Sequence, residues 1–391
     1  MKTILALFGL FTAAYALGQG PDQFEAFNLQ KKKTTLTTGI TMSYVERGNI
    51  GGASLILLHG CTDTGRSFQL LIDELVSVYP NLRIIAPDLR GHGDSSMPDR
   101  RTCASTPENC FTPAVLAADV LALMDQMEIQ SAYIVGHSMG SVVAQELALN
   151  FPERVNRMVL IGSMVYGKEN SFINDFLISG LIEKSWRPIL ETESDFSWPE
   201  DAYFITPESL GDETTSFLRK NWVNEPGTEE AFLDAILRET IQVPVGTWIG
   251  GITALGKTDN RNALQNLKVP TLILWAAQDT VFPLADQKLV ISSLEKAAQV
   301  NGTPVIYKTY GKESLPANGS QESDLGHNLQ WAAPKQIAGD IIAFVRNGFP
   351  RIDLPYLNPE NYNEVLVEQG RANIMDGRIH DTQALNTDKE H

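Results

Sequence analysis

The feature that most restricts the fold of this chain is an alternation of strand-length apolar runs with segments of helical spacing. Apolar runs that are bounded by turn residues and too short for helices are typical of buried strands. Strands that alternate with helices predict a mostly parallel sheet with helices on both faces, the α/β class. The expected strands are residues 40–46, 54–58, 82–86, 132–135, 155–161, 269–276 and 304–310, and the expected core helices are 67–79, 113–127, 141–150, 284–298 and 335–345.

The alternation is interrupted between the strand at 155–161 and the strand at 269–276. Residues 165–262 contain helical patterns but no convincing strand, and they hold four of the six tryptophans, Trp186, Trp198, Trp222 and Trp248. We therefore predict a helical cap inserted between two halves of the sheet. Most of its aromatic side chains are expected to pack the cap's own core, and the others to form an apolar ceiling over the site described below.

The two ends of the chain differ from the rest in composition. Lys2 precedes an apolar run at 3–17, and Ala14-Tyr15-Ala16 offers a small-x-small cleavage site. Residues 1–18 therefore predict a secretory signal peptide and a secreted, extracellular protein, with an apolar first helix of the domain as the alternative. Residues 351–391, with four basic and eight acidic side chains, predict a polar and mostly extended tail.

The charge balance restricts the possible partners. The chain has 31 Lys and Arg against 47 Asp and Glu, a net charge of −16, which repels nucleic acid and anionic lipid. No internal run reaches the ~20 apolar residues of a membrane span. We see no convincing metal-ligand spacing and no phosphate-binding glycine loop, so we expect no metal, no cofactor and a small-molecule partner. The sequence leaves the oligomeric state open.

A glycine-flanked serine is the strongest sequence signal of chemistry. Gly136-His137-Ser138-Met139-Gly140 fits the pattern G-x-S-x-G, and it lies between an expected strand and an expected helix. A tight strand-to-helix turn crowds any Cβ beside the serine, which explains both glycines. Ser138 is therefore the predicted nucleophile, with Gly136 and Gly140 forming its turn.

A serine hydroxyl needs a base and an orienting acid. Of the histidines after Ser138, His380 and His391 lie in the tail, so His327 is the predicted base, against the alternative of a surface histidine. Asp279 directly follows the buried strand at 269–276 and is the predicted acid. The order Ser, Asp, His is the one that this turn requires.

Attack by the serine creates an oxyanion, which requires backbone N–H donors. We expect one from Met139, the residue after the nucleophile, and the other from Cys61, in the loop after the strand at 54–58. His59 precedes the serine in the chain and is expected to buttress this loop rather than to act on the substrate.

The secretory prediction has consequences for the three cysteines and for two glycosylation sequons. In an oxidising compartment Cys103 and Cys110, seven residues apart in what reads as a loop, should form a disulfide, while Cys61 remains a free thiol. Asn301 and Asn318 begin Asn-x-Thr/Ser sequences and are predicted glycosylation sites in a eukaryotic host.

Together these motifs resemble the α/β-hydrolase superfamily, in the branch with a helical cap. The resemblance covers about residues 40–350 and rests on segments that stand in the expected order: His59-Gly60-Cys61-Thr62-Asp63, Asp88-Leu89-Arg90-Gly91-His92-Gly93-Asp94-Ser95, the Ser138 turn, Asp279 and Gly326-His327. It implies an eight-stranded, mostly parallel sheet with the cap inserted after the sixth strand. Residues 19–164 and 263–350 would form the core. Residues 311–326 look like an insertion.

The similarity is to esterase, enol-lactonase and C–C hydrolase relatives. Epoxide hydrolases and haloalkane dehalogenases carry an aspartate where this chain has Ser138. The sequence thus predicts a serine hydrolase that cleaves a carboxylic ester or lactone through an acyl-enzyme. Two alternatives stay open: C–C bond hydrolysis by the same residues, and a low-turnover receptor that binds a ligand under the cap.

Overall fold

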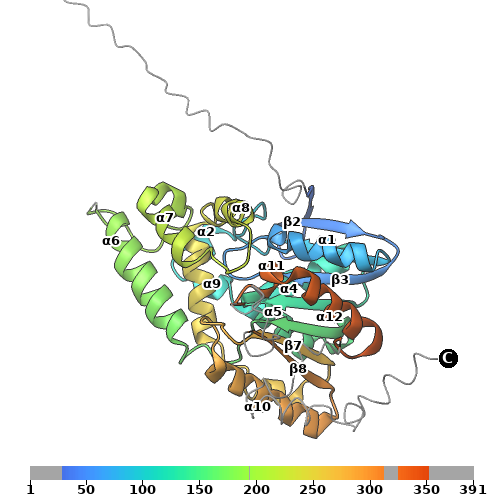
Figure 1. Cartoon of the computed structure of the whole chain (residues 1–391). Helices are drawn as coiled ribbons and strands as arrows, with labels where there is room; N and C mark the ends of the chain where they lie inside the picture. Colours follow the sequence, from blue (N-terminus) through green and yellow to red (C-terminus); the bar gives the residue numbers. More distant parts are fainter. Residues whose placement is uncertain (1–28, 193, 312–324, 352–391) are drawn as a thin grey trace, which may run out of the picture.

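The computed structural model describes residues 29–192, 194–311 and 325–351 (Figure 1). The predicted signal peptide, Asn318 and nearly all of the predicted tail lie outside these residues. Within them, one sheet of eight strands forms the centre of the molecule. The strands are β1 (Lys31–Thr35), β2 (Thr41–Gly48), β3 (Ala53–Leu58), β4 (Leu82–Pro87), β5 (Ala132–His137), β6 (Val155–Ile161), β7 (Thr271–Ala276) and β8 (Val305–Tyr310).

The sheet has the order β1-β2-β4-β3-β5-β6-β7-β8. Strands β1 and β2 pair antiparallel, β2 pairs antiparallel with β4, and every other pair is parallel. The predicted eight-stranded, mostly parallel sheet is therefore confirmed. In a parallel sheet the loops after the strands meet at one edge, which brings the loops after β3, β5, β7 and β8 together.

Alternate side chains of the central strands pack on opposite faces of the sheet. Leu55 and Leu57 of β3 belong to the cluster beneath α1 (Gln69–Val78) and α12 (Pro334–Asn347). Ile56 and Leu58 belong to the cluster with α4 (Pro113–Gln126), α5 (Met139–Asn150) and α10 (Leu284–Asn301). Both faces are buried, as expected for parallel strands without polar alternation. Short helical turns, η2 (Gly65–Phe68), η3 (Pro152–Arg154), η6 (Ala263–Asn266) and α11 (Leu329–Ala332), connect these elements.

The chain between β6 and β7 forms a group of helices at one end of the sheet (Figure 1). An isolated antiparallel β-bridge between Tyr166 and Asp259 joins the beginning and the end of this segment. The helices are η4 (Phe172–Trp186, with π-type hydrogen bonds), α6 (Arg187–Leu190), η5 (Pro207–Leu210), α7 (Asp212–Asn221), α8 (Glu230–Thr240) and α9 (Val245–Lys257). We refer to residues 165–262 as the cap.

Three features differ from the sequence prediction. The pattern does not predict β1, because its sequence, Lys-Lys-Lys-Thr-Thr, has no apolar alternation; it is an edge strand that pairs only with β2. Helix α7 is also absent from the predicted elements. The presumed loop around the two cysteines instead contains two one-turn helices, α2 (Arg100–Cys103) and α3 (Pro107–Cys110), and Cys103 is bonded to Cys110 with a Cα–Cα distance of 5.8 Å.

Asn301 lies at the exposed end of α10, in the first predicted sequon. Its side-chain amide donates to the carbonyl oxygens of Gln265, at 3.3 Å, and Leu267, at 3.1 Å. The Thr303 hydroxyl of the same sequon is buried and donates to Leu267 as well. Glycosylation at Asn301 replaces one of the two amide hydrogens and would therefore remove at least one of the bonds that this amide donates. None of the helices in the described part of the chain is both long and apolar enough to cross a bilayer.

Candidate active site

Ser138 lies at the turn between β5 and α5 in a backbone conformation that L-residues rarely adopt, with φ 52° and ψ −120°. Such strain is typical of functional turns. Both flanking glycines are required because a larger residue would clash with nearby backbone. A Cβ at Gly136 would lie 2.2 Å from the carbonyl oxygen of Gly140, and a Cβ at Gly140 would lie 2.1 Å from the carbonyl oxygen of Leu58. The turn holds Ser138 where β5 ends.

His327 and Asp279 approach each other from the loops after β8 and β7. His327 Nδ1 lies 2.9 Å from Asp279 Oδ2, while Asp279 Oδ1 accepts hydrogen bonds from the amides of Val281 and Phe282, each at 2.9 Å. The two amides fix the carboxylate, and its remaining oxygen fixes the imidazole. Gly162, with φ +51°, makes room for the ring, since a Cβ there would lie 3.0 Å from His327 Cε1.

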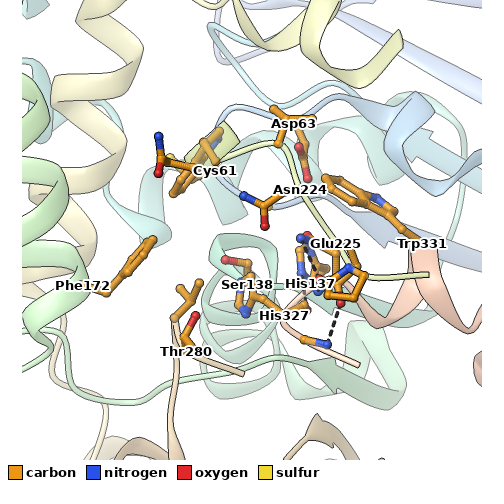
Figure 2. Close-up of a pocket in the computed structure, with 18 of the residues that line it drawn as sticks. Cys61, Asp63, His137, Ser138, Phe172, Asn224, Glu225, Thr280, His327 and Trp331 are labelled. Atoms are coloured by element: carbon orange, nitrogen blue, oxygen red, sulfur yellow. Dashed lines mark hydrogen bonds between the residues drawn. The ribbon is translucent and has the colours of Figure 1, made fainter. Parts of the chain in front are cut away.

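Ser138 and His327 line one cavity of about 370 Å³ between the sheet and the cap (Figure 2). Nε2 of His327 is buried and has no hydrogen-bond partner among the described residues. Its other ring nitrogen is occupied by Asp279, so the ring has one free nitrogen, as a general base requires. The structure thus brings Ser138, His327 and Asp279 together, although Ser138 and His327 are not hydrogen-bonded to each other in it.

The charge around His327 favours its protonated form. Burial alone would lower the pKa of the imidazole, but the carboxylates of Asp279, Glu225 and Asp63 together raise the pKa above its usual range. Neighbouring His137 has no such partner: burial and the nearby His327 hold the pKa of His137 well below normal, so that ring stays neutral.

The predicted oxyanion donors come from the start of α5, directly after Ser138, and from the loop after β3. Met139 is the first residue of α5, and the first amides of a helix have no acceptor within it. Cys61 lines the cavity and is a buried free thiol, and burial raises the pKa of this thiol far above its usual range. His59 accepts from the Leu89 amide through Nε2 at 2.9 Å, while its Nδ1 lies 2.8 Å from the Gly60 carbonyl oxygen, so it braces this loop.

The cap is fastened to the loop after β3. The indole Nε1 of Trp222 donates to the hydroxyl oxygen of Thr62 at 2.8 Å, directly beside Cys61. Arg66 donates to the carboxylate of Glu239 on α8 at 2.8 Å, and the Thr64 hydroxyl donates to the same carboxylate. The cap is therefore bonded, through side chains, to the loop that contains Cys61.

Glu225 fastens the cap to the loop of His327. Its Oε1 accepts from the amide of Gly326 at 2.6 Å, and its Oε2 accepts from the amide of Asn328 at 2.9 Å. The backbone on both sides of His327 is thus held by one buried cap carboxylate. Burial raises the pKa of Glu225 even though these amides oppose the shift.

The expected apolar ceiling is only partly present. Trp186 and Trp248 are fully buried in the cap's own core, with ring centroids 4.9 Å apart, and Trp198 lies beneath the Arg187 guanidinium. Of the four cap tryptophans only Trp222 lines the cavity. The side chains that the cap contributes to the cavity are mixed: Phe172, Trp222, Val223 and Pro226 are apolar, while Asn221, Asn224 and Glu225 are polar.

Asp63 and Glu225 are cavity residues that the sequence pattern does not single out. Asp63 stands within the His59–Asp63 motif, which offers a signal, since it lies two residues beyond the predicted oxyanion amide. Glu225 lies between helices of the cap, where nothing in the local pattern connects it with His327. Only the tertiary fold brings these two carboxylates to the site.

The profile of the alpha/beta hydrolase fold family matches residues 53–315. The chain belongs to this family. Its sequence is 28% identical over 249 residues, 63% of the chain, to the dihydrolipoyllysine-residue acetyltransferase component of an acetoin cleaving system from Cupriavidus necator, of which the match spans 57%. The chain thus spans little more than half of that relative.

Two further similarities cover a larger share of the protein with which the chain is compared. The 3-oxoadipate enol-lactonase 2 of Acinetobacter baylyi is 25% identical over 270 residues, which cover 67% of this chain and 87% of the lactonase. The solved structure of an esterase from Exiguobacterium antarcticum has a TM-score of 0.59 at 15% identity, covering 81% of this chain and 100% of the esterase. The likeness to the esterase is one of fold.

Proposed function

We propose that the chain is a cofactor-free serine hydrolase that cleaves a carboxylic ester or lactone. The observation that carries this proposal is the arrangement of His327. Asp279 holds its Nδ1 at 2.9 Å, and the buried Nε2 is left without a partner in the cavity that Ser138 also lines. A base that is oriented at one nitrogen and free at the other, next to a strained serine, is suited to activating that serine.

In the first half of the reaction Ser138 Oγ attacks the carbonyl carbon, and His327 Nε2 takes the hydroxyl proton. Asp279 keeps the imidazole in the required tautomer and stabilises its cation. The negative oxygen of the tetrahedral intermediate is held by the N–H groups of Met139 and Cys61. As the intermediate collapses, the bond to the alcohol oxygen breaks and His327 returns the proton to that oxygen.

In the second half His327 takes a proton from water, and the hydroxide attacks the acyl carbon bound to Ser138. Collapse of the second intermediate releases the carboxylic acid and returns the proton to Ser138 Oγ. No redox partner or metal is needed for this balance. A lactone gives a hydroxy acid by the same steps.

The relatives support ester chemistry. One is named an enol-lactonase and a structural neighbour is named an esterase. Relatives named epoxide hydrolases also occur, but the nucleophile position of this chain is a serine. Attack by a serine on an epoxide would leave an alkyl ether, which has no carbonyl carbon for water to attack, whereas an aspartate would leave an ester that water can hydrolyse. We therefore favour attack on a carbonyl carbon.

The test is a panel of p-nitrophenyl esters and lactones assayed with the parent protein and with Ser138→Ala, Asp279→Asn and His327→Ala. We expect measurable hydrolysis by the parent and a loss of about 10³-fold or more in kcat for Ser138→Ala. Hydrolysis that persists in Ser138→Ala overturns the mechanism. Activity on diketones without activity on any ester would favour C–C bond hydrolysis, and ligand binding without turnover would favour a receptor.

We further propose that the protein is secreted after removal of residues 1–18 and that the cap spans 165–262. The Cys103–Cys110 disulfide supports secretion, because such bonds persist in oxidising compartments. N-terminal sequencing of protein from the medium should give a start within a few residues of Ala16. Intact-mass measurement before and after glycosidase treatment tests Asn301 and Asn318. An unprocessed start at Met1 would contradict the secretory proposal.

A further inference from the structure

The cavity beside Ser138 has a charge pattern that the proposed reaction does not use. Its described lining contains two carboxylates, Asp63 and Glu225, and neither lysine nor arginine. The lining also includes neutral polar side chains and three aromatic ones, Phe172, Trp222 and Trp331. Apart from His327, the catalytic base of the proposed reaction, the charged groups of these walls are carboxylates, and the walls are rich in π surface.

Asp63 is buried, with 7% of its surface exposed, and Figure 2 shows its carboxyl group directed into the cavity. No lysine, arginine or histidine in the described ranges lies within 4 Å of it. Burial raises the pKa of Asp63 to about 7, because the charge of His327, the Ser67 hydroxyl and the Gly60 amide oppose the burial only in part and the Glu239 carboxylate adds to it. His327 interacts with Asp63 from beyond ion-pair distance and is shared with the carboxylates of Asp279 and Glu225. A buried carboxylate that has no ion-pair partner of its own is costly, and a ligand cation would relieve that cost.

Glu225 adds a second negative charge to the same wall. All its protein partners are N–H donors: the amides of Gly326 and Asn328, and the side-chain amide of Asn328 at 3.3 Å. An acceptor of three N–H groups through both oxygens is best served by the ionised form. No described cation lies within 4 Å of this carboxylate either, and the more distant His327, which is shared with Asp279 and Asp63, offsets its charge only in part.

The two cavity tryptophans contribute π surface rather than N–H donors. Trp222 Nε1 donates to Thr62, and Trp331 Nε1 donates to the Ser67 carbonyl oxygen at 3.0 Å. With both N–H groups used by the protein, a ligand meets only the carbon surface of these indoles. Indole rings attract cations, and carboxylates close by strengthen that attraction.

We propose that this cavity recognises esters in which one part bears an ammonium group, with Asp63 as the residue that determines this specificity. The inference rests on the proposed ester hydrolysis and names its substrate class. The cavity of about 370 Å³ suits a small cationic ester and places its charge among Asp63, Trp222 and Trp331. A carboxylate-bearing substrate would meet repulsion from Asp63 and Glu225.

The test compares three matched thioesters at pH 8, where Asp63 is ionised. The probes are butyrylthiocholine, its neutral isostere S-(3,3-dimethylbutyl) thiobutyrate, and an anionic S-(2-carboxyethyl) thiobutyrate. We expect kcat/KM of the cationic probe to exceed that of the neutral one by about tenfold or more, and the anionic probe to be the poorest. Asp63→Asn should reduce the cation-to-neutral ratio towards one, whereas Asp195→Asn, at an exposed cap position, should leave the ratio unchanged.

Two results would overturn this inference: equal kcat/KM for the cationic and neutral probes, or a ratio that Asp63→Asn does not change. If no ester is hydrolysed at all, the proposed function fails, and binding then decides the inference separately. Calorimetric titration of Ser138→Ala with choline and with 3,3-dimethylbutanol should show tighter binding of choline. Equal or weaker binding of choline refutes the cationic site whatever the chemistry.

Discussion

At the scale of single residues, the site depends on backbone positions that only certain residues can fill. Ser138 keeps φ at 52° although it is not glycine, and Gly162, at the end of β6, keeps φ at +51° beside the His327 ring. The first strain exposes the predicted nucleophile, and the second gives the predicted base its place. Neither conformation follows from composition, but the glycine spacing around Ser138 predicts the first.

Gly162→Ala should therefore impair catalysis and not only stability. The new methyl group would lie 3.0 Å from the His327 ring and push it away from Ser138, so we expect kcat to fall by about ten- to a hundredfold. Gly39→Ala is the matched control, because Gly39 has φ +85° but a methyl group there would meet no atom within 4 Å. It should cost about 1 kcal/mol in the free energy of unfolding and leave kcat unchanged. Equal kcat in the two variants would contradict the placement of His327.

The pH dependence of kcat/KM should reflect the carboxylates around His327. The base must be neutral to act, and a raised pKa keeps it protonated to a higher pH, so activity should be lost as the pH falls through a value above the ordinary ~6.5 of histidine. Glu225→Gln removes one of the charges that raise this pKa, and the acidic limb should move to lower pH. Glu213→Gln, at an exposed position on α7, should leave it in place. A limb that shifts upward in Glu225→Gln would contradict this sign.

At the scale of elements, the cap is part of the site rather than a separate cover. Trp222 bonds the loop of Cys61, and Glu225 bonds the loop of His327. The sequence identifies Trp222 as an aromatic residue of the cap, but its partner Thr62 lies 160 positions away. Cap helices with clear amphipathic periodicity are predictable, whereas these long-range bonds depend on how the cap docks.

The Cys103–Cys110 bond joins the last residues of the one-turn helices α2 and α3, and we expect both helices to depend on it. They have little apolar surface of their own, and α3 packs against α9, where a Cβ at Gly250 would lie 2.4 Å from the Phe111 ring. Replacing both cysteines by serine should lower the free energy of unfolding by about 2–3 kcal/mol, in the chain-entropy treatment of a short loop. Denaturant titration checks this value. Reductant should lower the melting temperature of the parent but not of the double variant, and a Cys61 crosslink in non-reducing peptide maps would contradict the pairing.

At the scale of the whole molecule, the central sheet and the relative order of the site residues follow from the sequence, because buried parallel strands have continuous apolar runs. Strand β1 cannot be predicted from an apolar pattern, because it has no apolar face. It is stabilised by pairing with β2 and by the Lys31–Asp88 ion pair at 2.8 Å. The cavity wall that contains Asp63 and Glu225 cannot be predicted from the sequence either. Its two carboxylates come from separate parts of the chain, the loop after β3 and the cap, and no local pattern indicates that they meet.

The net charge of −16 should influence encounter with a cationic ester. Salt screens this attraction: raising the ionic strength from about 0.01 M to about 0.1 M shortens the Debye length from about 30 Å to about 10 Å. We expect kcat/KM for butyrylthiocholine to fall over this range while that of its neutral isostere changes little. Parallel behaviour of the two probes would mean that the surface charge does not steer the substrate.

The proposed mechanism requires a covalent acyl-enzyme on Ser138, which intact-mass spectrometry can detect. The protein is quenched in acid during turnover of a p-nitrophenyl ester, or after treatment with a fluorophosphonate, and the adduct is located by peptide mapping. We predict a mass increase equal to one acyl or phosphonyl group, on the peptide containing Ser138, and none in Ser138→Ala. An adduct on another residue, or an adduct of the same yield in Ser138→Ala, would contradict the account.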